Sequence, residues 1–298
     1  MSDPERRVPG RVAGGPGKGP RLLAVDLDGT LLDRNGQPHA RDVRAVRAAL
    51  GAGIRVTVVT GRLYSGTRPA VQELGIEGAV ACADGSHIVR ARDDMTLVHW
   101  GLAGESAHLL RDALKADDLT AFVFADDAIG HDARGVPFVG YVSTWSMDVR
   151  AAADVFSHDL WVAGPGVTAA VAMGPRDSVA AAVGRLSRVL ADAVRVAMFP
   201  IRRGGHEGTW ALIARSSAGT KGTATQWIAE QEGVALADTV CVGDWINDVP
   251  MFEVTGRSFA MGHSPDEVKS QATDILTETV EEGGGVARAI EEAFGIRA

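Results

Sequence analysis

The chain has 298 residues, of which 46% are hydrophobic and 23% are charged, and its formal net charge is −8. This composition is typical of a folded globular protein and excludes an intrinsically disordered one, and the length predicts about two domains. An acidic chain without a dense run of Lys and Arg is not expected to bind nucleic acid, although local charge can still bind a small phosphate ester.

The first twenty residues are rich in Gly and Pro and lack the apolar middle of a signal peptide, so we expect a disordered tail over 1–20. We expect no contact with a membrane, because the longest uncharged apolar stretch, 160–175, is too short to span one and contains Gly and Pro. Cys82 and Cys241 lie in apolar runs, where buried free thiols are expected rather than a disulfide. These features predict a cytoplasmic protein, monomeric or a small homo-oligomer.

The first predicted strand, 21–26, is an apolar run that ends in two carboxylates, Asp26 and Asp28, followed by Gly29-Thr30. Ligands of open α/β sheets lie beyond the carboxyl ends of such buried parallel strands. Two carboxylates there repel each other by about 4 kcal/mol at an effective dielectric constant near 20, and a phosphate dianion adds to the repulsion. The pair therefore predicts a divalent cation. A plain turn is the alternative, and the bidentate Glu of a calcium loop is missing.

The second predicted strand, 54–60, follows a predicted helix over 38–51 and leads into Thr60-Gly61-Arg62. A hydroxyl group and a backbone amide at the end of a strand can hold a phosphoryl oxygen. Thr-Gly after a strand is also ordinary turn chemistry, so this segment gains meaning only beside the other motifs.

Two later segments offer further partners for the carboxylates. Lys221 stands at the start of a predicted helix, where a cation is unfavourable unless an anion lies against it. A buried strand over 239–243 runs into Asp244 and Asp248, which fall about one turn apart if a helix begins near Ile246. Such a pair suits Mg²⁺, which takes one or two carboxylates and keeps several waters.

Taken in this order, the four segments resemble the motifs of the haloacid dehalogenase-like (HAD) superfamily. The long insertion between Thr60-Gly61-Arg62 and Lys221 resembles the C2-type cap of the Cof-type subfamily. Two positions differ from the usual pattern of that subfamily: Asp84-Gly85 stands where relatives usually have Asn-Gly, and His263 stands where an Asn is common. These differences concern the contacts to substrate rather than the chemistry.

The predicted fold is α/β, a doubly wound parallel-sheet (Rossmann-like) core with an inserted α+β cap domain. We expect the core over 21–86 and 216–298 and the cap, which would set substrate specificity, over 87–215. The remaining elements expected in the core are helix 65–74, strand 79–83, helix 221–232, helix 247–254, strands 258–261 and 273–276, and helix 285–294. Those expected in the cap are strands 121–124 and 136–141 and helices 105–116 and 177–192.

The resemblance implies a Mg²⁺-dependent phosphatase acting on a small phosphorylated metabolite, a sugar phosphate or similar phosphomonoester. Asp26 would attack phosphorus to form an aspartyl-phosphate, and Asp28 would pass a proton to the leaving alkoxide and take one from the attacking water. The residues expected to hold the phosphoryl group or the substrate are Thr60, Gly61, Arg62, Lys221 and Asn247. The expected metal ligands are Asp26, Asp28 through its backbone carbonyl, Asp244 and Asp248.

Two other functions fit the same residues. A phosphomutase acting on hexose phosphates would use the same carboxylates, and a catalytically retired binding or regulatory protein would keep the fold. For the substrate, Arg202, Arg203 and His206 share a Gly-rich turn that suits a second anionic group, with a solvated loop as the alternative. Trp245 follows Asp244 directly and would wall the site.

Overall fold

The computed structural model describes residues 21–201 and 205–297. The chain forms two compact units, a first unit of Met1–Thr57 with Thr225–Ala298 and a second unit of Val58–Ala224. The tail expected over 1–20 and the pair Arg202 and Arg203 lie outside the described residues. The second unit takes in more of the chain than the cap expected over 87–215, and that predicted domain division stays a prediction.

The first unit contains a five-stranded sheet in the order β14-β13-β12-β1-β2. β1 pairs with β12, β12 with β13 and β13 with β14, all in parallel. The strands are β1 (Leu22–Val25), β2 (Arg55–Val58, whose last residue opens the second unit), β12 (Thr239–Gly243), β13 (Arg257–Ala260) and β14 (Asp274–Ile275). The helices are α1 (Ala40–Gly51), α6 (Lys221–Gln231, which begins in the second unit), α7 (Val249–Val254), α8 (Asp266–Lys269) and α9 (Gly285–Phe294).

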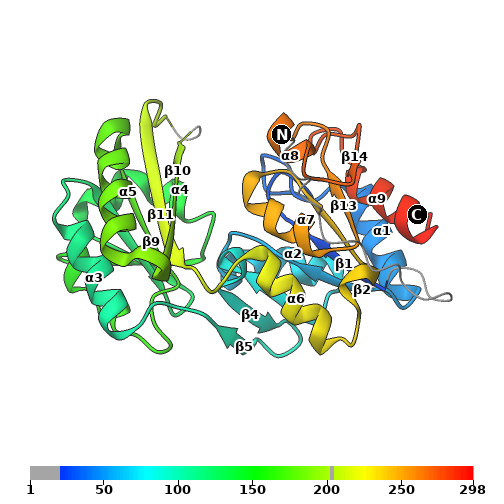
Figure 1. Cartoon of the computed structure of the whole chain (residues 1–298), viewed down its shortest axis with the longest axis horizontal. Coiled ribbons are helices and arrows are strands. Elements are labelled where there is room, and N and C mark those ends of the chain that lie inside the picture. Colours follow the sequence, from blue (N-terminus) through cyan, green and yellow to red (C-terminus); the bar gives the residue numbers. More distant parts are fainter. Residues whose placement is uncertain (1–20, 202–204, 298) are drawn as a thin grey trace, which may run out of the picture. The chain divides into compact units, whose positions relative to one another are not determined.

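Burial explains why these elements form. The four residues of β1 are at most 1% exposed, as the apolar run predicted for a strand inside a parallel sheet. Helices α1 and α9 pack together (Figure 1) and share a buried polar contact. The carboxylate of Asp42 accepts hydrogen bonds from the backbone N–H groups of Gly284 (2.8 Å) and Ala287 (2.7 Å) at the start of α9. The pKa of Asp42 is raised, because the effect of burial is larger than the lowering by the two hydrogen bonds.

The second unit begins with α2 (Tyr64–Leu74) and a three-stranded antiparallel sheet of β3 (Ala79–Cys82), β4 (His87–Arg90) and β5 (Met95–His99). We expected the third strand in the parallel sheet. β3 forms a parallel bridge between Ala81 and Val59, and a 3₁₀ turn at Ala83–Gly85 then folds β4 back onto β3 as an antiparallel neighbour.

The rest of the second unit is the expected α+β cap, built on a six-stranded sheet in the order β10-β11-β9-β6-β7-β8. Its pairs are antiparallel except β7 with β8. Helices α3 and α5 lie side by side, with α5 packed against β9, β10 and β11 (Figure 1). The bounds are α3 (Gly104–Lys115), β6 (Thr120–Ala125), β7 (Ala128–His131), α4 (Val139–Val142), β8 (Asp148–Ala151), β9 (Ala169–Pro175), α5 (Arg176–Leu190), β10 (Val194–Pro200) and β11 (Thr209–Ser216).

The strand predicted over 136–141 is wrong. A 3₁₀ helix over Ala133–Phe138 runs into α4 instead. The carboxylate of Asp132 accepts a hydrogen bond from the N–H of Arg134 (2.9 Å) and starts the helical turn. Pro137, which lacks an N–H, fits a helical turn better than a strand within a sheet.

The state of the two cysteines agrees with the prediction from the sequence. Cys82 and Cys241 are buried free thiols. Burial raises the pKa of Cys82 to about 12 and also raises the pKa of Cys241. Within residues 21–201 and 205–297, none of the helices has the length and apolar character needed to cross a membrane.

Candidate active site

Three buried carboxylates come together where β1 and β12 end. Asp26 follows β1 directly, Asp244 follows β12, and Asp248 stands one turn later. These three residues are 4%, 8% and 0% exposed. Each offers one oxygen, and the three oxygens lie within 4.8 Å of one another. The carboxylates of the first and fourth sequence motifs, Asp26, Asp244 and Asp248, therefore lie together.

The turn after β1 is shaped around Asp244. The hydroxyl group of Thr30 donates a hydrogen bond to Oδ1 of Asp244 (3.1 Å). Gly29 has a φ of +89°, and a Cβ atom there would lie 2.8 Å from Cγ of Asp244. Position 29 therefore needs a glycine both for its left-handed backbone and for the space that the carboxylate fills.

Asp248 orders the backbone of the loop after β12. Its Oδ2 atom accepts hydrogen bonds from the backbone N–H groups of Asp244 (2.9 Å) and Trp245 (3.0 Å). A Cβ atom at Gly243 would lie 2.5 Å from Cγ of Asp248, so this glycine also makes room for a carboxylate. Asp248 thereby fixes the loop that presents Asp244, in addition to offering a ligand atom of its own. Trp245 is 46% exposed beside it.

The donor set fits a magnesium ion. Three carboxylate oxygens are the hard ligands that Mg²⁺ prefers, and their burial makes a compensating cation favourable. The carboxylate of Asp28 is not in this group and its residue is exposed, so the part expected of its backbone carbonyl stays a prediction. His263, which replaces the usual Asn, places Nε2 3.5 Å from Oδ2 of Asp244.

The second motif, in the second unit, forms a compact loop. Thr60 is fully buried, its N–H donates to the carbonyl oxygen of Ala81 (2.9 Å), and its hydroxyl oxygen accepts from the N–H of Arg62 (3.2 Å). The guanidinium group of Arg62 donates to the carbonyl oxygen of Gly66 (3.2 Å). This loop packs against the segment after β3, where the N–H of Asp84 donates to the carbonyl oxygen of Thr60 (2.8 Å).

Lys221, the third motif, is 1% exposed at the start of α6. The turn before it packs closely on the same segment after β3. A Cβ atom at Gly85 would lie 2.7 Å from the carbonyl carbon of Thr220, and one at Gly219 would lie 2.6 Å from Cα of Ser86. The segment 83–86 therefore contacts both the turn before Lys221 and the loop that carries Thr60.

Asn247 and His206 were also predicted to contact the substrate. Asn247 is partly exposed in the 3₁₀ turn Ile246–Asp248 that leads into α7, and its contact with substrate stays a prediction. Of the Gly-rich cap turn, His206 is described, and its ring lies 4.5 Å from that of Phe138.

Two arginines at this site were not predicted. Arg215 pairs with Asp84, and Arg195 donates to the carbonyl oxygen of Gly219. The available signal was a charged residue directly after the apolar run Ala211–Ala214, shortly before Lys221. Thr30 belongs to the Gly-Thr pair after Asp28, and nothing in the sequence indicates its hydrogen bond to Asp244.

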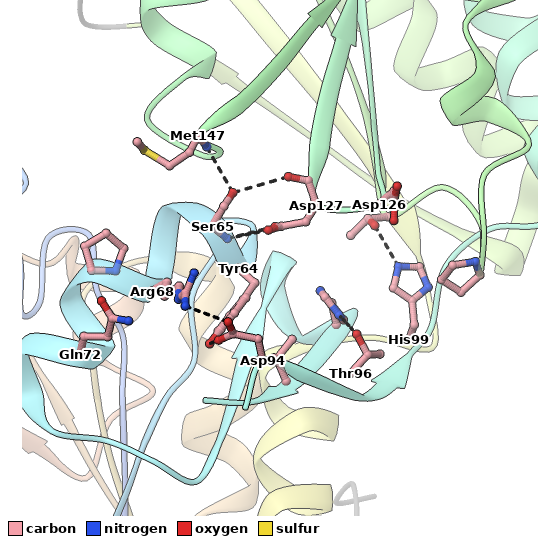
Figure 2. Close-up of a pocket in the computed structure, with 15 residues that line it drawn as sticks. Tyr64, Ser65, Arg68, Gln72, Asp94, Thr96, His99, Asp126, Asp127 and Met147 are labelled. Atoms are coloured by element: carbon pink, nitrogen blue, oxygen red, sulfur yellow. Dashed lines mark hydrogen bonds and ion pairs between the residues drawn. The ribbon is translucent and has the colours of Figure 1, made fainter. Parts of the chain in front are cut away.

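A pocket of about 880 Å³ also lies within the second unit, lined by α2, β4, β5 and residues of the cap (Figure 2). None of the residues predicted for catalysis or metal binding lines it. Figure 2 shows the carboxylate of Asp127 at the start of α2, where it accepts from the N–H of Ser65 (2.9 Å and 3.0 Å). His87 and His99 line the same pocket with their rings 5.3 Å apart.

Comparisons with known proteins indicate the family and the fold of this chain. A sequence model of the haloacid dehalogenase-like hydrolase family matches residues 23–148 and 206–290. The chain is 24% identical over 264 residues to a pyridoxal phosphate phosphatase of Escherichia coli, covering 86% of this chain and 93% of that enzyme. It is 25% identical over 286 residues to a 5-amino-6-(5-phospho-D-ribitylamino)uracil phosphatase of Bacillus subtilis, covering 89% and 95%. A solved haloacid dehalogenase-like hydrolase from Bacteroides thetaiotaomicron shares the fold, with a TM-score of 0.79, 22% identity, and coverage of 92% and 99%.

Proposed function

We propose that this chain, which belongs to the haloacid dehalogenase-like hydrolase family, is a phosphatase that releases phosphate from a small phosphorylated metabolite. The relatives named above are phosphatases of small phosphorylated molecules, and they match the chain over most of its length. The substrate is a sugar phosphate or a similar phosphomonoester, and the enzyme depends on Mg²⁺.

The observation that carries this proposal is the group of three buried carboxylates, Asp26, Asp244 and Asp248. These residues would hold Mg²⁺, together with the backbone carbonyl of Asp28. When bound, the metal ion would neutralise part of the negative charge on the carboxylates and on the phosphate. Asp26 is the carboxylate at the end of β1, where the α/β sheet presents its ligand-binding edge.

The chemistry follows from the two carboxylates of the first motif. An oxygen of Asp26 bonds to phosphorus as the bond between phosphorus and the leaving oxygen breaks, and Asp28 gives its proton to that oxygen. Asp28 then takes a proton from water, whose oxygen attacks phosphorus and returns Asp26 as phosphate departs. Thr60 and Lys221 hold the phosphoryl oxygens, a role that comes from their sequence motifs.

The first experiment measures phosphate release from an aryl phosphate with Mg²⁺. We expect Asp26→Asn to lower kcat by at least about 100-fold, because an amide oxygen is a poor nucleophile. Asp93→Asn is the matched control, since Asp93 is an exposed carboxylate paired with Arg90. Wild-type turnover in Asp26→Asn would mean that Asp26 is not the nucleophile.

A second variant separates the two carboxylates. An aryl phosphate has a good leaving group that needs no proton, so Asp28→Asn should still be phosphorylated but should lose its phosphoryl group slowly. Mass spectrometry after an acid quench should then find one phosphoryl group on Asp26. With a hexose phosphate as substrate, free phosphate indicates a phosphatase, whereas an isomeric hexose phosphate indicates a mutase.

A further inference from the structure

Two arginines of the cap sheet reach the loops that carry the predicted phosphate-binding residues. Arg195 on β10 and Arg215 on β11 are directly opposite each other in the antiparallel pair. The guanidinium group of Arg215 forms an ion pair with the carboxylate of Asp84, and that of Arg195 donates to the carbonyl oxygen of Gly219. One strand pair therefore contacts both the segment after β3 and the turn before Lys221.

The segment 83–86 lies against both phosphate-binding motifs. On one side, Ala83 and Asp84 donate backbone hydrogen bonds to the carbonyl oxygens of Arg62 (2.7 Å) and Thr60 (2.8 Å). On the other side, Gly85 contacts the carbonyl group of Thr220 so closely that a Cβ atom would overlap it. A shift of this segment would therefore move the backbone next to Thr60 and the backbone next to Lys221 together.

The backbone of this segment is strained, and the strain bears on the choice of Asp. Ala83 and Asp84 have φ values of +51° and +53°, in the left-handed region that non-glycine residues seldom adopt. Asn tolerates this region at least as well as Asp. Backbone preference therefore does not explain a carboxylate at position 84. Its contact with Arg215 does.

The charges of Asp84, Arg195 and Arg215 also favour a carboxylate at position 84. The side chains of Asp84 and Arg215 are only 6% and 13% exposed, so water screens the pair weakly. Burial and the positive charge of Arg215 lower the pKa of Arg195, and the carboxylate of Asp84 raises it. The one carboxylate of Asp84 thus compensates two neighbouring guanidinium groups. A Cβ atom at Gly61 would lie 3.3 Å from Oδ1 of Asp84, so this charge also lies against the Thr60 loop.

We propose that Asp84 and Arg215 are positioning residues, whose ion pair holds the segment 83–86 and, through it, the backbone that presents Thr60 and Lys221. This inference rests on the proposed function, because it assigns Thr60 and Lys221 to the phosphoryl group. Neither Asp84 nor Arg215 needs to touch the substrate. Their effect is on the geometry of the groups that stabilise the transition state, where small displacements have large effects on rate.

The test is a double-mutant cycle of Asp84→Asn, Arg215→Gln and the double variant, assayed with an aryl phosphate and Mg²⁺. We expect each single variant to lower kcat about 10- to 100-fold and to weaken inhibition by inorganic phosphate. The double variant should be no slower than the slower single variant, because each single change already breaks the ion pair between Asp84 and Arg215. Arg215→Lys, which keeps the charge but not the planar fork, should recover part of kcat.

A matched control is available in the cap. Arg185, on α5, pairs with Asp117, and their side chains are 34% and 12% exposed. Arg185→Gln should change the unfolding temperature and leave kcat and phosphate inhibition unchanged. Folding of every variant is checked by circular dichroism and thermal unfolding. Asp84→Asn keeps the shape of the side chain and suits the backbone, which makes it the variant expected to fold best.

The outcomes separate this inference from the proposed function. Folded Asp84→Asn and Arg215→Gln with wild-type kcat and wild-type phosphate inhibition would overturn the positioning role, as would losses that simply multiply in the double variant. An inactive wild-type protein would overturn the proposed function instead. In that case calorimetry with inorganic phosphate decides the positioning role. Weaker binding in Asp84→Asn supports it, and equal binding or no binding by the wild type overturns it.

Discussion

The imidazole ring of His87, which lines the pocket of the second unit, should make the protein less stable in mild acid. Its Nε2 atom is hydrogen-bonded to the hydroxyl group of Thr96 (2.9 Å). Burial, and to a smaller extent the neighbouring His99, lower the pKa of His87 from 6.5 to about 4. The unfolded chain therefore takes up a proton on this ring at a higher pH than the folded chain does.

The sign and size of the effect follow from proton linkage. Because the folded pKa is the lower one, the contribution to stability is complete above pH 6.5 and is lost as the pH falls toward 4. Between about pH 8 and about pH 5, these two pKa values correspond to a loss of about 2 kcal/mol. Since the residue is partly exposed, we expect a loss of about 1–2 kcal/mol in the free energy of unfolding.

The assay compares urea unfolding at both pH values for the wild type and for His87→Gln, which keeps a polar side chain near Thr96. Asp42 and Asp127 have raised pKa values and act in the opposite direction, but they are common to both proteins and cancel in the difference. His108→Gln is the control, because it removes an exposed imidazole of α3 outside the pocket. The same pH-dependent loss in His87→Gln as in the wild type would show that His87 does not cause the loss of stability in acid.

Two further predictions concern the first unit. Asp42→Ala should lower the free energy of unfolding by about 2–4 kcal/mol, because the buried N–H groups of Gly284 and Ala287 lose their acceptor; urea unfolding measures this, and a variant as stable as the wild type would contradict it. Gly29→Ala should raise the Mg²⁺ concentration for half-maximal activity at least about tenfold, because its Cβ displaces Asp244. Gly53→Ala is the control, since Gly53 has a φ of +82° but no atom within 4 Å of the added Cβ. If both glycine variants raised the Mg²⁺ requirement equally, backbone strain rather than displacement of Asp244 would be the cause.

The parts of the fold that follow a regular apolar period were predictable from the sequence. The strand predicted over 239–243 is β12, and the helix predicted over 285–294 is α9. The cap segment 136–141 has the aromatic and β-branched residues of a strand, and only its neighbours make it helical. A local pattern can therefore indicate an element but cannot weigh the capping carboxylate of Asp132 against it.

The site divides in a similar way. The cluster of Asp26, Asp244 and Asp248 could be predicted, because the carboxyl ends of neighbouring parallel strands lie at one edge of a sheet. The ion pair of Asp84 and Arg215 could not, because these residues are 131 positions apart and no periodicity relates them. The replacement of Asn by Asp was visible in the sequence, but its partner required the structure.

The motif glycines have a physical cause that the sequence alone left ambiguous. Gly29 and Gly243 each stand where a Cβ atom would overlap a carboxylate of the cluster of Asp26, Asp244 and Asp248, and Gly85 stands where it would overlap the backbone before Lys221. Gly75, by contrast, ends α2 with open space around it. Turn formation can explain the last kind of glycine but not the first three, since any turn-compatible residue would still collide with a site group. Close approach of the backbone to the carboxylate cluster and to the turn before Lys221 is therefore the reason these three positions need glycine, and these loops are held by packing as well as by charge.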